Sequence, residues 1–285
     1  MKYDNQPYWA RMHQRHGGLL RAVGHSSLSE EFNKLKYASE SGTFLDLLHG
    51  LKPKLRERAK LSALDVGAGT GYWTGLFSNW CREENLNAEM SVLDLSPDAL
   101  KSIQASYPWV EAIQQDLGSV DVSLLSNAFD LVMAFYCLHH LVRIGPFLNA
   151  LTFSAKSVRS GGFLMIMDPI LTRPFTYLDT LDFASFEGNG IPRHLYLLDD
   201  VLSKEGLRRV TLRPVVSFVL NGNIEGDSRG AFLICNSIWK MMQICYRRSA
   251  WTKRIGRGVL VLDEVLKNTN LGFSSSLCLY QKGRV

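Results

Sequence analysis

The stretch "LDVGAGTGYW", residues 64–73, constrains the fold more than any other part of this chain. An apolar run contains Asp65 at its end, and glycines then occupy every second position at Gly67, Gly69 and Gly71. A glycine-rich turn after a buried strand leaves the backbone open to a ligand, because no side chain stands in the way. The stretch therefore predicts the first strand, turn and helix of an α/β sheet, with a binding site at the turn.

From residue 61 onwards, short apolar segments alternate with amphipathic ones, which is typical of a doubly wound, mainly parallel α/β sheet. Helices are expected to begin at Ser96, as an N-cap before Pro97, and to end at Gly161-Gly162. The expected strands are 61–66, 88–94, 110–117, 129–138, 163–169, 210–220 and 274–283, and the expected helices are 71–85, 96–107, 146–162 and 195–207.

Two helical additions flank this pattern. Residues 1–60 predict an N-terminal extension that packs on the core as a lid, with Ser29 as an N-cap. Residues 221–273 predict a helical cap inserted before the last strand, and its segment 231–245 is apolar on nearly all sides, which predicts a buried helix. The core is then expected at 61–220 and 274–285.

Composition bounds the class of protein. The five cysteines form no CxxC pair and are odd in number, so neither a disulfide framework nor a zinc knuckle is expected. The N-terminus lacks an apolar leader, and no run reaches the ~18 apolar residues of a membrane-spanning helix. These features predict a cytoplasmic protein. The net charge of +5 permits an anionic partner without requiring one.

Acidic residues end the first three expected strands. Asp65 can accept a bond from a ligand ammonium or order the turn, and Asp94 can accept two bonds from ribose hydroxyls. Asp116 follows the third strand, near the place where an adenine amino group would lie. A single acid at a strand end is usually solvated, but three beside one glycine turn indicate a nucleoside site.

Two other known kinds of ligand-binding glycine turn do not match this sequence. A dinucleotide fingerprint, G-x-G-x-x-G, needs a glycine where this chain has the bulky Tyr72. A phosphate-binding P-loop needs Gly-Lys-Ser/Thr, which is absent from the turn. The turn therefore favours a ligand that has no phosphate to neutralise.

"LDVGAGTG" resembles motif I of the class I S-adenosylmethionine-dependent methyltransferases, and "FDLVMAFYCLHHL" and "GGFLMIMDP" resemble later motifs of that family. The resemblance is strong over about 60–170 and implies a seven-stranded sheet whose last strand is antiparallel. It also implies S-adenosylmethionine as the cofactor. The residues expected to bind it are Tyr37, Asp65, Gly67, Ala68, Gly69, Gly71, Asp94, Leu95, Asp116, Leu117 and Phe135.

The resemblance places the methyl acceptor near the end of the fourth strand. A hydroxyl acceptor needs a general base, and histidine suits that role near neutral pH. His139 and His140 are the candidate bases, although a histidine at a strand end is often only structural, and Asp168 is expected to orient a histidine or bind substrate. No metal is expected.

The segment Ala134–Cys137 lacks the prolines of the nucleic-acid amino-methyltransferase motif, so no nucleic-acid partner is expected. We therefore expect O-methylation of a small molecule, such as a secondary metabolite or a glycan. One alternative is a lipid-linked acceptor at a membrane surface, reached through the basic and aromatic segment 246–257, which is otherwise a solvated helix end. Another is a protein that binds the cofactor without catalysis. The oligomeric state stays open.

Overall fold

The computed structural model describes residues 4–173, 189–222, 228–268 and 273–283. Its main sheet has seven strands in the order β3-β2-β1-β4-β5-β9-β8, and only β9 runs antiparallel to its neighbours. This arrangement confirms the predicted fold class. The strands are β1 Leu61–Val66, β2 Ala88–Asp94, β3 Glu111–Gln114, β4 Phe129–Phe135, β5 Val158–Asp168, β8 Leu207–Ser217 and β9 Phe273–Lys282.

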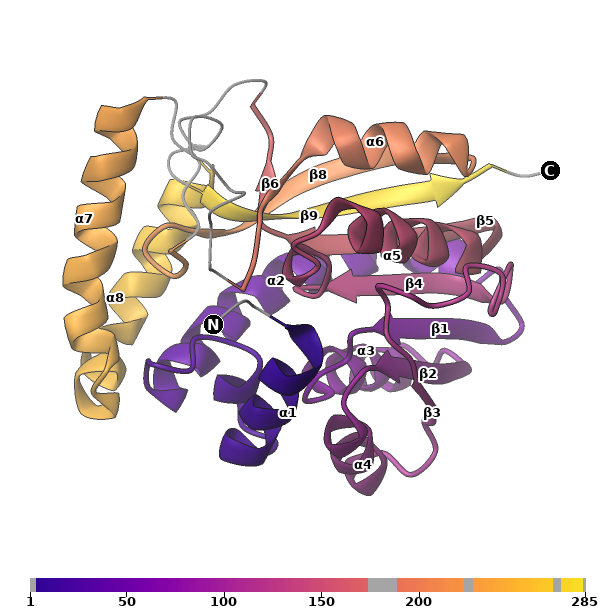
Figure 1. Cartoon of the computed structure of the whole chain (residues 1–285), viewed down its shortest axis with the longest axis horizontal. Coiled ribbons are helices and arrows are strands. Elements are labelled where there is room, and N and C mark those ends of the chain that lie inside the picture. Colours follow the sequence, from indigo (N-terminus) through magenta and orange to yellow (C-terminus); the bar gives the residue numbers. More distant parts are fainter. Residues whose placement is uncertain (1–3, 174–188, 223–227, 269–272, 284–285) are drawn as a thin grey trace.

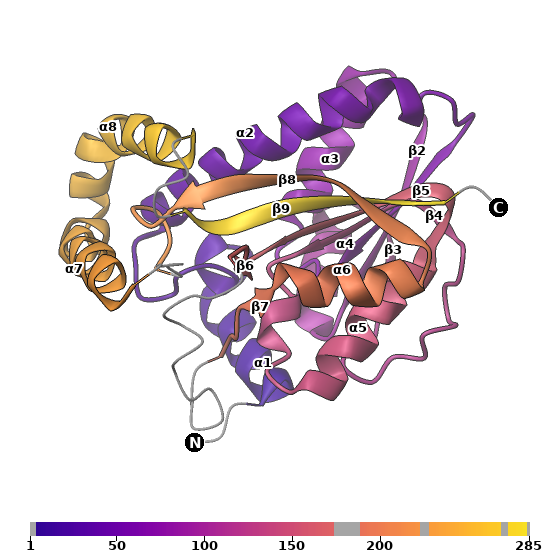
Figure 2. The same cartoon turned by 90° about the horizontal axis from the view of Figure 1, so that it is seen from above.

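Helices cover both faces of the sheet. One face carries α2 (Glu30–Leu55), α3 (Tyr72–Glu83) and α4 (Pro97–Ser106), and the other carries α5 (Ile144–Ser157) and α6 (Leu195–Lys204), with α2 and α6 well separated across the sheet in Figure 2. Strand β4 serves both cores because its side chains alternate: Met133 faces the first layer and Val132 the second.

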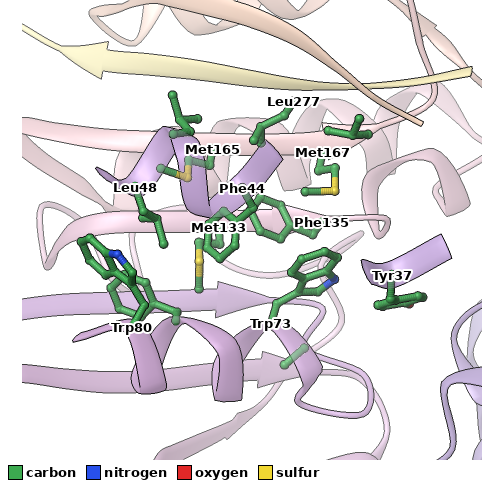
Figure 3. Packing of buried hydrophobic residues seen from close by; sticks show 14 of the residues in the cluster. Tyr37, Phe44, Leu48, Trp73, Trp80, Met133, Phe135, Met165, Met167 and Leu277 are labelled. Carbon is green, nitrogen blue, oxygen red and sulfur yellow. The ribbon is translucent and has the colours of Figure 1, made fainter. Parts of the chain in front are cut away.

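The core on the first face is rich in aromatic and sulfur-containing side chains (Figure 3). Phe44 of α2 meets Trp73 of α3 and Phe135 of β4 with ring centroids 5.8 and 5.2 Å apart, both edge to face. Tyr37 stacks on Trp73 at 5.5 Å. This packing fixes α2 against the start of α3, which directly follows the glycine turn, and against the end of β4. Helix α2 does so although it precedes both elements in the sequence.

Both predicted N-caps are confirmed. The Ser29 hydroxyl accepts the Phe32 N–H at 3.2 Å, and the Ser96 hydroxyl accepts the Ala99 N–H at 3.3 Å. The predicted end of α5 is wrong, because the helix stops at Ser157 and Gly161-Gly162 lie within β5. A Cβ on Gly162 would come within 2.9 Å of the Asp130 carbonyl oxygen, so this glycine serves close strand packing instead of a helix end.

The N-terminal part is helical, as predicted. It consists of α1 (Asn5–His16), a short 3₁₀ turn at Leu20–Ala22 and α2. Between β5 and α6, a parallel pair of short strands forms from β6 (Ile170–Leu171) and β7 (Arg193–His194), while 174–188 lie outside the described residues. None of the helices in the described ranges is long and apolar enough to cross a membrane.

The insertion before β9 forms two helices, α7 (Arg229–Tyr246) and α8 (Ser249–Asn268), which stand side by side beyond the end of the sheet (Figures 1 and 2). The prediction that 231–245 is a buried helix is wrong. Within that span only Trp239 is buried, whereas Ile234, Met241 and Ile244 are 64%, 64% and 69% exposed. An apolar helix needs neighbours on several sides, and α7 packs chiefly on α8 and on the start of α2.

Candidate functional site

The turn after β1 can be made only by glycine at its tightest points. Gly67 and Gly69 have φ angles of +69° and +56°, a region that side chains disfavour. A Cβ on Gly67 would lie 2.5 Å from Cys137 Cβ, and one on Gly69 would lie 2.7 Å from Val23 Cγ1. Gly71, with φ +75°, is the left-handed N-cap of α3. The turn is therefore held closely between β4 and the N-terminal extension.

A cleft of about 790 Å³, partly open to solvent, lies over this turn. It sits at the carboxyl ends of β1 and β4, where the strand order reverses, which is the usual ligand position in such sheets. Nine of the eleven residues that the sequence predicts to bind the cofactor line the cleft: Tyr37, Gly67, Ala68, Gly69, Asp94, Leu95, Asp116, Leu117 and Phe135. Gly71 and Asp65 do not.

Asp65 is fully buried behind the turn. Its Oδ2 accepts a hydrogen bond from the Thr74 hydroxyl of α3 at 2.6 Å. Burial raises the pKa of Asp65 to about 7. Of the two roles that the sequence leaves open for this acid, the geometry agrees with ordering the turn and α3.

Asp94 lies at the end of β2 and faces the cleft. Its two carboxyl oxygens accept the backbone N–H groups of Gly69 and Ser96, both at 2.8 Å. Each oxygen keeps a further lone pair, so the group can still accept bonds from a ligand. Burial raises the pKa of Asp94, and the two backbone bonds oppose this change.

Asp116 is more exposed than Asp94. The predicted third strand runs to 117, but β3 ends at Gln114, so Asp116 lies in the following turn. There it accepts the Gly118 N–H at 2.9 Å. It still contributes to the cleft wall beside Leu117.

The charged residues of the cleft favour a cationic ligand over an anionic one. Asp94 and Asp116 line it, and no lysine or arginine does so among the described residues. The Thr70 hydroxyl in the turn is buried and has no hydrogen-bond partner in the described part of the chain. An acidic, partly aromatic cleft with an unsatisfied hydroxyl fits the cationic sulfonium nucleoside that the sequence resemblance implies, and would repel a pyrophosphate.

His139 and Asp168 form a close pair. Strand β4 is followed by a 3₁₀ turn, Leu138–His140, which brings His139 to the end of β5. His139 Nδ1 lies 2.5 Å from Asp168 Oδ1, and the His139 backbone N–H donates to Oδ2 at 3.1 Å. Burial disfavours charge on both groups: it lowers the pKa of His139 and raises the pKa of Asp168. The pair therefore holds one proton between its two close atoms.

His139 borders a second cavity of about 1070 Å³, which also opens to solvent. Val23, Tyr136 and His140 line both this cavity and the first cleft, so the two spaces adjoin. His140 Nδ1 hydrogen-bonds the Asn189 carbonyl oxygen, and the Trp9 ring packs on His140 at 4.8 Å, edge to face. The two predicted histidines thus lie together but differ: His139 faces only the second cavity, and His140 forms part of the wall between the two.

Two charged residues at the second cavity were not predicted from the sequence. Lys36 lines the cavity, and Glu40 is buried behind it, both on α2. A Lys–Glu pair four residues apart usually indicates a solvated helix face, so no signal in the sequence separated this pair from a surface one. His13 and Thr70 of the first cleft were also not singled out as cofactor ligands.

A model of the family described as "Methyltransferase domain" matches residues 63–162. A curated relative, 5-methylorsellinic acid synthase from Aspergillus terreus, is 29% identical over 168 residues, or 57% of this chain. That alignment spans 6% of the relative's own length.

Solved structures share the fold. One is described as a candidate sarcosine dimethylglycine methyltransferase from Galdieria sulphuraria; it has a TM-score of 0.52 and 14% identity, covering 85% of this chain and 84% of that one. Another comes from a complex between the Haloferax volcanii Trm112 methyltransferase activator and its candidate methyltransferase, with a TM-score of 0.50, 11% identity and full coverage of both chains.

Proposed function

We propose that the chain is a class I S-adenosylmethionine-dependent methyltransferase and that it transfers the methyl group to a hydroxyl oxygen of a small molecule, as its methyltransferase-domain match and its fold support. The observation that carries the proposal is the His139–Asp168 pair in the wall of a second cavity that adjoins the glycine-turn cleft. A cofactor cleft beside a separate, polar cavity with a positioned histidine supplies the alignment and the base that assist methyl transfer to a hydroxyl.

The cofactor supplies an activated methyl carbon bound to sulfur. We assign its ribose to Asp94, its adenine to the region of Asp116 and Leu117, and its amino-acid end to Tyr37, because these residues line successive parts of the cleft. Phe135 and the three backbone positions Gly67–Gly69 would pack against it. Asp65 and Gly71 would act from behind by fixing the turn.

His139 is the proposed general base. Its Nδ1 is engaged by Asp168, while Nε2 has no hydrogen-bond partner among the described residues. When the acceptor oxygen forms its bond to the methyl carbon and the carbon–sulfur bond breaks, the hydroxyl proton passes to His139 Nε2. The role requires the shared proton of the pair to rest on Nδ1 and Asp168 to be ionised, so that Nε2 carries the accepting lone pair and Asp168 offsets the charge that the ring gains. Burial lowers the pKa of His139, so the ring is neutral before the transfer. His140 would hold the acceptor at the boundary of the two spaces.

The acceptor class rests on the size and polarity of the second cavity. Its space of about 1070 Å³, which includes the solvent-open mouth, leaves room for a small organic molecule, and histidine, serine and asparagine side chains line it. The curated relative is named for an acid that bears a methyl substituent, which supports an organic secondary metabolite over a glycan. We also propose a cytoplasmic location, supported by five cysteines that are all free thiols.

Transfer of labelled methyl groups from S-adenosylmethionine to a panel of phenolic and polyketide-type metabolites tests the proposal. We expect a product with a methoxy carbon in its NMR spectrum. His139→Ala should reduce turnover by roughly 10²–10⁴-fold, whereas His49→Ala, an exposed histidine on α2, should leave it unchanged. Label in a carbon-bound methyl group, or full turnover in His139→Ala, would contradict the assignment of oxygen or of the base.

A lipid-linked acceptor at a membrane surface is the second candidate, and the α7–α8 pair favours it. Apolar side chains on these helices point to solvent: Leu233, Ile234, Met241, Ile244, Trp251, Val261, Leu262 and Val265. Residues 229–268 also hold eight lysines and arginines but two carboxylates, a net charge of +6, whereas the whole chain carries +5. Exposed apolar residues beside concentrated positive charge suit an anionic bilayer.

Flotation with vesicles of phosphatidylglycerol and phosphatidylcholine tests this candidate. We expect the protein to float with anionic vesicles, less so at high salt, and Met241→Asp with Ile244→Asp to stay at the bottom. Val210→Asp, at another exposed apolar position, on β8, is the control and should float like the wild type. Absence of flotation at low salt would remove the candidate.

A further inference from the structure

Lys36 places a positive charge in the wall of the second cavity. It lies in the second turn of α2, and the residue is 4% exposed. Its Nζ donates to Glu40 Oε1 at 2.5 Å and lies 4.1 Å from the centre of the Tyr136 ring. Lysine is rarely this buried unless it is paired, and Glu40 is the partner that holds this ammonium at the cavity wall.

The rest of the described cavity wall is uncharged at neutral pH. No aspartate or glutamate lines it, and Lys36 is the one lysine or arginine that does. Burial lowers the pKa of His25 to about 4, and those of His139 and His140 to about 3, so these rings are neutral at pH 7. The cavity therefore presents one cation and no anion to whatever enters it.

The counter-charge of Lys36 lies behind it. Glu40 is fully buried and does not line the cavity. Its Oε1 also accepts the Tyr136 hydroxyl at 2.5 Å, so Glu40 is fixed to the protein by two donors. An ammonium has three N–H donors, and the Glu40 bond uses one. Donors of Lys36 thus remain for a ligand in front.

Tyr136 links this pair to the catalytic region. It has a φ of +52°, which is uncommon for a residue with a side chain and indicates local strain that the surroundings must hold. Its hydroxyl bonds Glu40, its ring faces the Lys36 ammonium, and it precedes His139 by three positions. The position of the cation is therefore set relative to the proposed base.

We propose that Lys36 binds a carboxylate of the methyl acceptor, so that the acceptor class is an organic acid held in the second cavity. The inference deepens the proposed function, because it takes this cavity as the acceptor site. The cofactor's own carboxylate is the other source of the same chemistry. Lys36 lines the second cavity and not the glycine-turn cleft, whereas Tyr37 lines the cleft, so the two neighbours on α2 serve different ligands.

Equilibrium binding tests the inference without requiring turnover. Calorimetry would measure 4-hydroxybenzoate, 2,4-dihydroxybenzoate and 2,4-dihydroxy-6-methylbenzoate against their methyl esters, on protein saturated with S-adenosylhomocysteine. A hydrogen bond to a charged partner contributes enough for a preference of roughly tenfold to a hundredfold for an acid over its ester. We expect at least one acid in the panel to show this preference.

The variants are chosen to avoid leaving a buried charge unpaired. Lys36→Gln combined with Glu40→Gln removes both charges and keeps the shape of the pair, and it should abolish the preference for the acid. Glu40→Gln alone keeps the ammonium and should retain or increase the preference. The affinity for S-adenosylhomocysteine should stay within about threefold of the wild type in both variants, which also shows that they are folded.

Three results would overturn the inference: no acid binds better than its ester, the double variant keeps the preference, or its loss accompanies an equal loss of S-adenosylhomocysteine affinity. The last result would assign Lys36 to the cofactor's carboxylate. If the acid preference holds while His139→Ala retains full turnover, the acid site stands and the base assignment fails. The two proposals can therefore fail separately.

Discussion

Single residues decide whether the first cleft can form. Three glycines in the left-handed region shape the turn, and Asp94 closes it by accepting the Gly69 N–H. These positions were predicted from sequence because the turn chemistry is local. The outcome for Asp65 differs, since its buried bond to Thr74 depends on how α3 packs against β1.

Gly69→Ala should abolish cofactor binding. The new Cβ would lie 2.7 Å from Val23 Cγ1 in a backbone region that alanine disfavours, so the turn must move away from Asp94. Isothermal titration with S-adenosylmethionine measures the loss. The matched control is Gly42→Ala, an exposed position within α2 with open space around it, which should bind normally and gain up to about 1 kcal/mol of stability. Normal binding by Gly69→Ala would contradict the placement of the cofactor.

Asp65→Asn should change how stability depends on pH. Burial raises the pKa of Asp65 from 3.8 to about 7 in the folded protein, so the folded state holds this proton more tightly than the unfolded chain. The contribution of Asp65 to stability therefore falls as pH rises from about 4 to about 7. The free energy of unfolding of Asp65→Asn relative to wild type should improve by up to ~4 kcal/mol between pH 4 and pH 8.

Urea unfolding at both pH values measures this shift. Gly42→Ala, a change that involves no titratable group, is the control and should differ from wild type by the same amount at pH 4 and pH 8. A pH-independent difference for Asp65→Asn would show that the buried carboxyl keeps an ordinary pKa.

The sequence predicted which residues would gather around the candidate base, but not how they would contact one another. His139, His140 and Asp168 were expected at strand ends, and the structure brings them together. Sequence could not separate the histidines, because their roles depend on distant partners: Asp168 from β5 for one, and Asn189 for the other. The sequence could not single out Lys36 for the same reason, since its burial against Glu40 and Tyr136 is what distinguishes it from a surface lysine.

Among the elements, those with strong periodicity or capping residues were predicted well, and those whose burial depends on remote neighbours were not. The strands and the two serine-capped helices belong to the first group. Helix α7 belongs to the second: its apolar composition predicted burial, but the fold supplies it with few neighbours. The third strand was predicted to end three residues too late for a related reason, because Asp116 bonds its own turn instead of a strand partner.

Helix α1 should matter for cofactor binding through one face only. Trp9 and His13, one turn apart, line the cleft, while Arg11 and Arg15 are exposed. Trp9→Ala with His13→Ala should weaken the cofactor's affinity about tenfold or more, because the cleft loses one apolar wall. Arg11→Ala with Arg15→Ala, equally spaced on the outer face, should bind within about twofold of wild type. Titration of both pairs checks this, and equal affinities would mean that α1 does not close on the cofactor.

The whole molecule should respond to its cofactor as one cooperative unit. The cleft is built from the core strands together with the N-terminal extension, so a bound ligand ties these parts together. At a concentration of about 100 times Kd, S-adenosylmethionine should add ~2.7 kcal/mol of stability and raise the melting temperature by about 5 °C. NAD at the same concentration should not, since the cleft has acidic residues and no lysine or arginine among those described. Thermal unfolding followed by fluorescence decides between the two, and equal stabilisation by NAD would contradict the assigned ligand.

Helix α2 has a consequence for how this enzyme could change. It lies outside the segment 63–162 that the domain model matches, yet consecutive residues on it, Lys36 and Tyr37, border the two adjoining spaces. Selection for a different acceptor would have to act on a helix whose next residue, Tyr37, lines the proposed cofactor cleft. New acceptor specificities should therefore arise more readily in the α7–α8 insertion than on this helix. Transferring residues 63–162 alone into another protein would leave out the α2 residues that line both spaces.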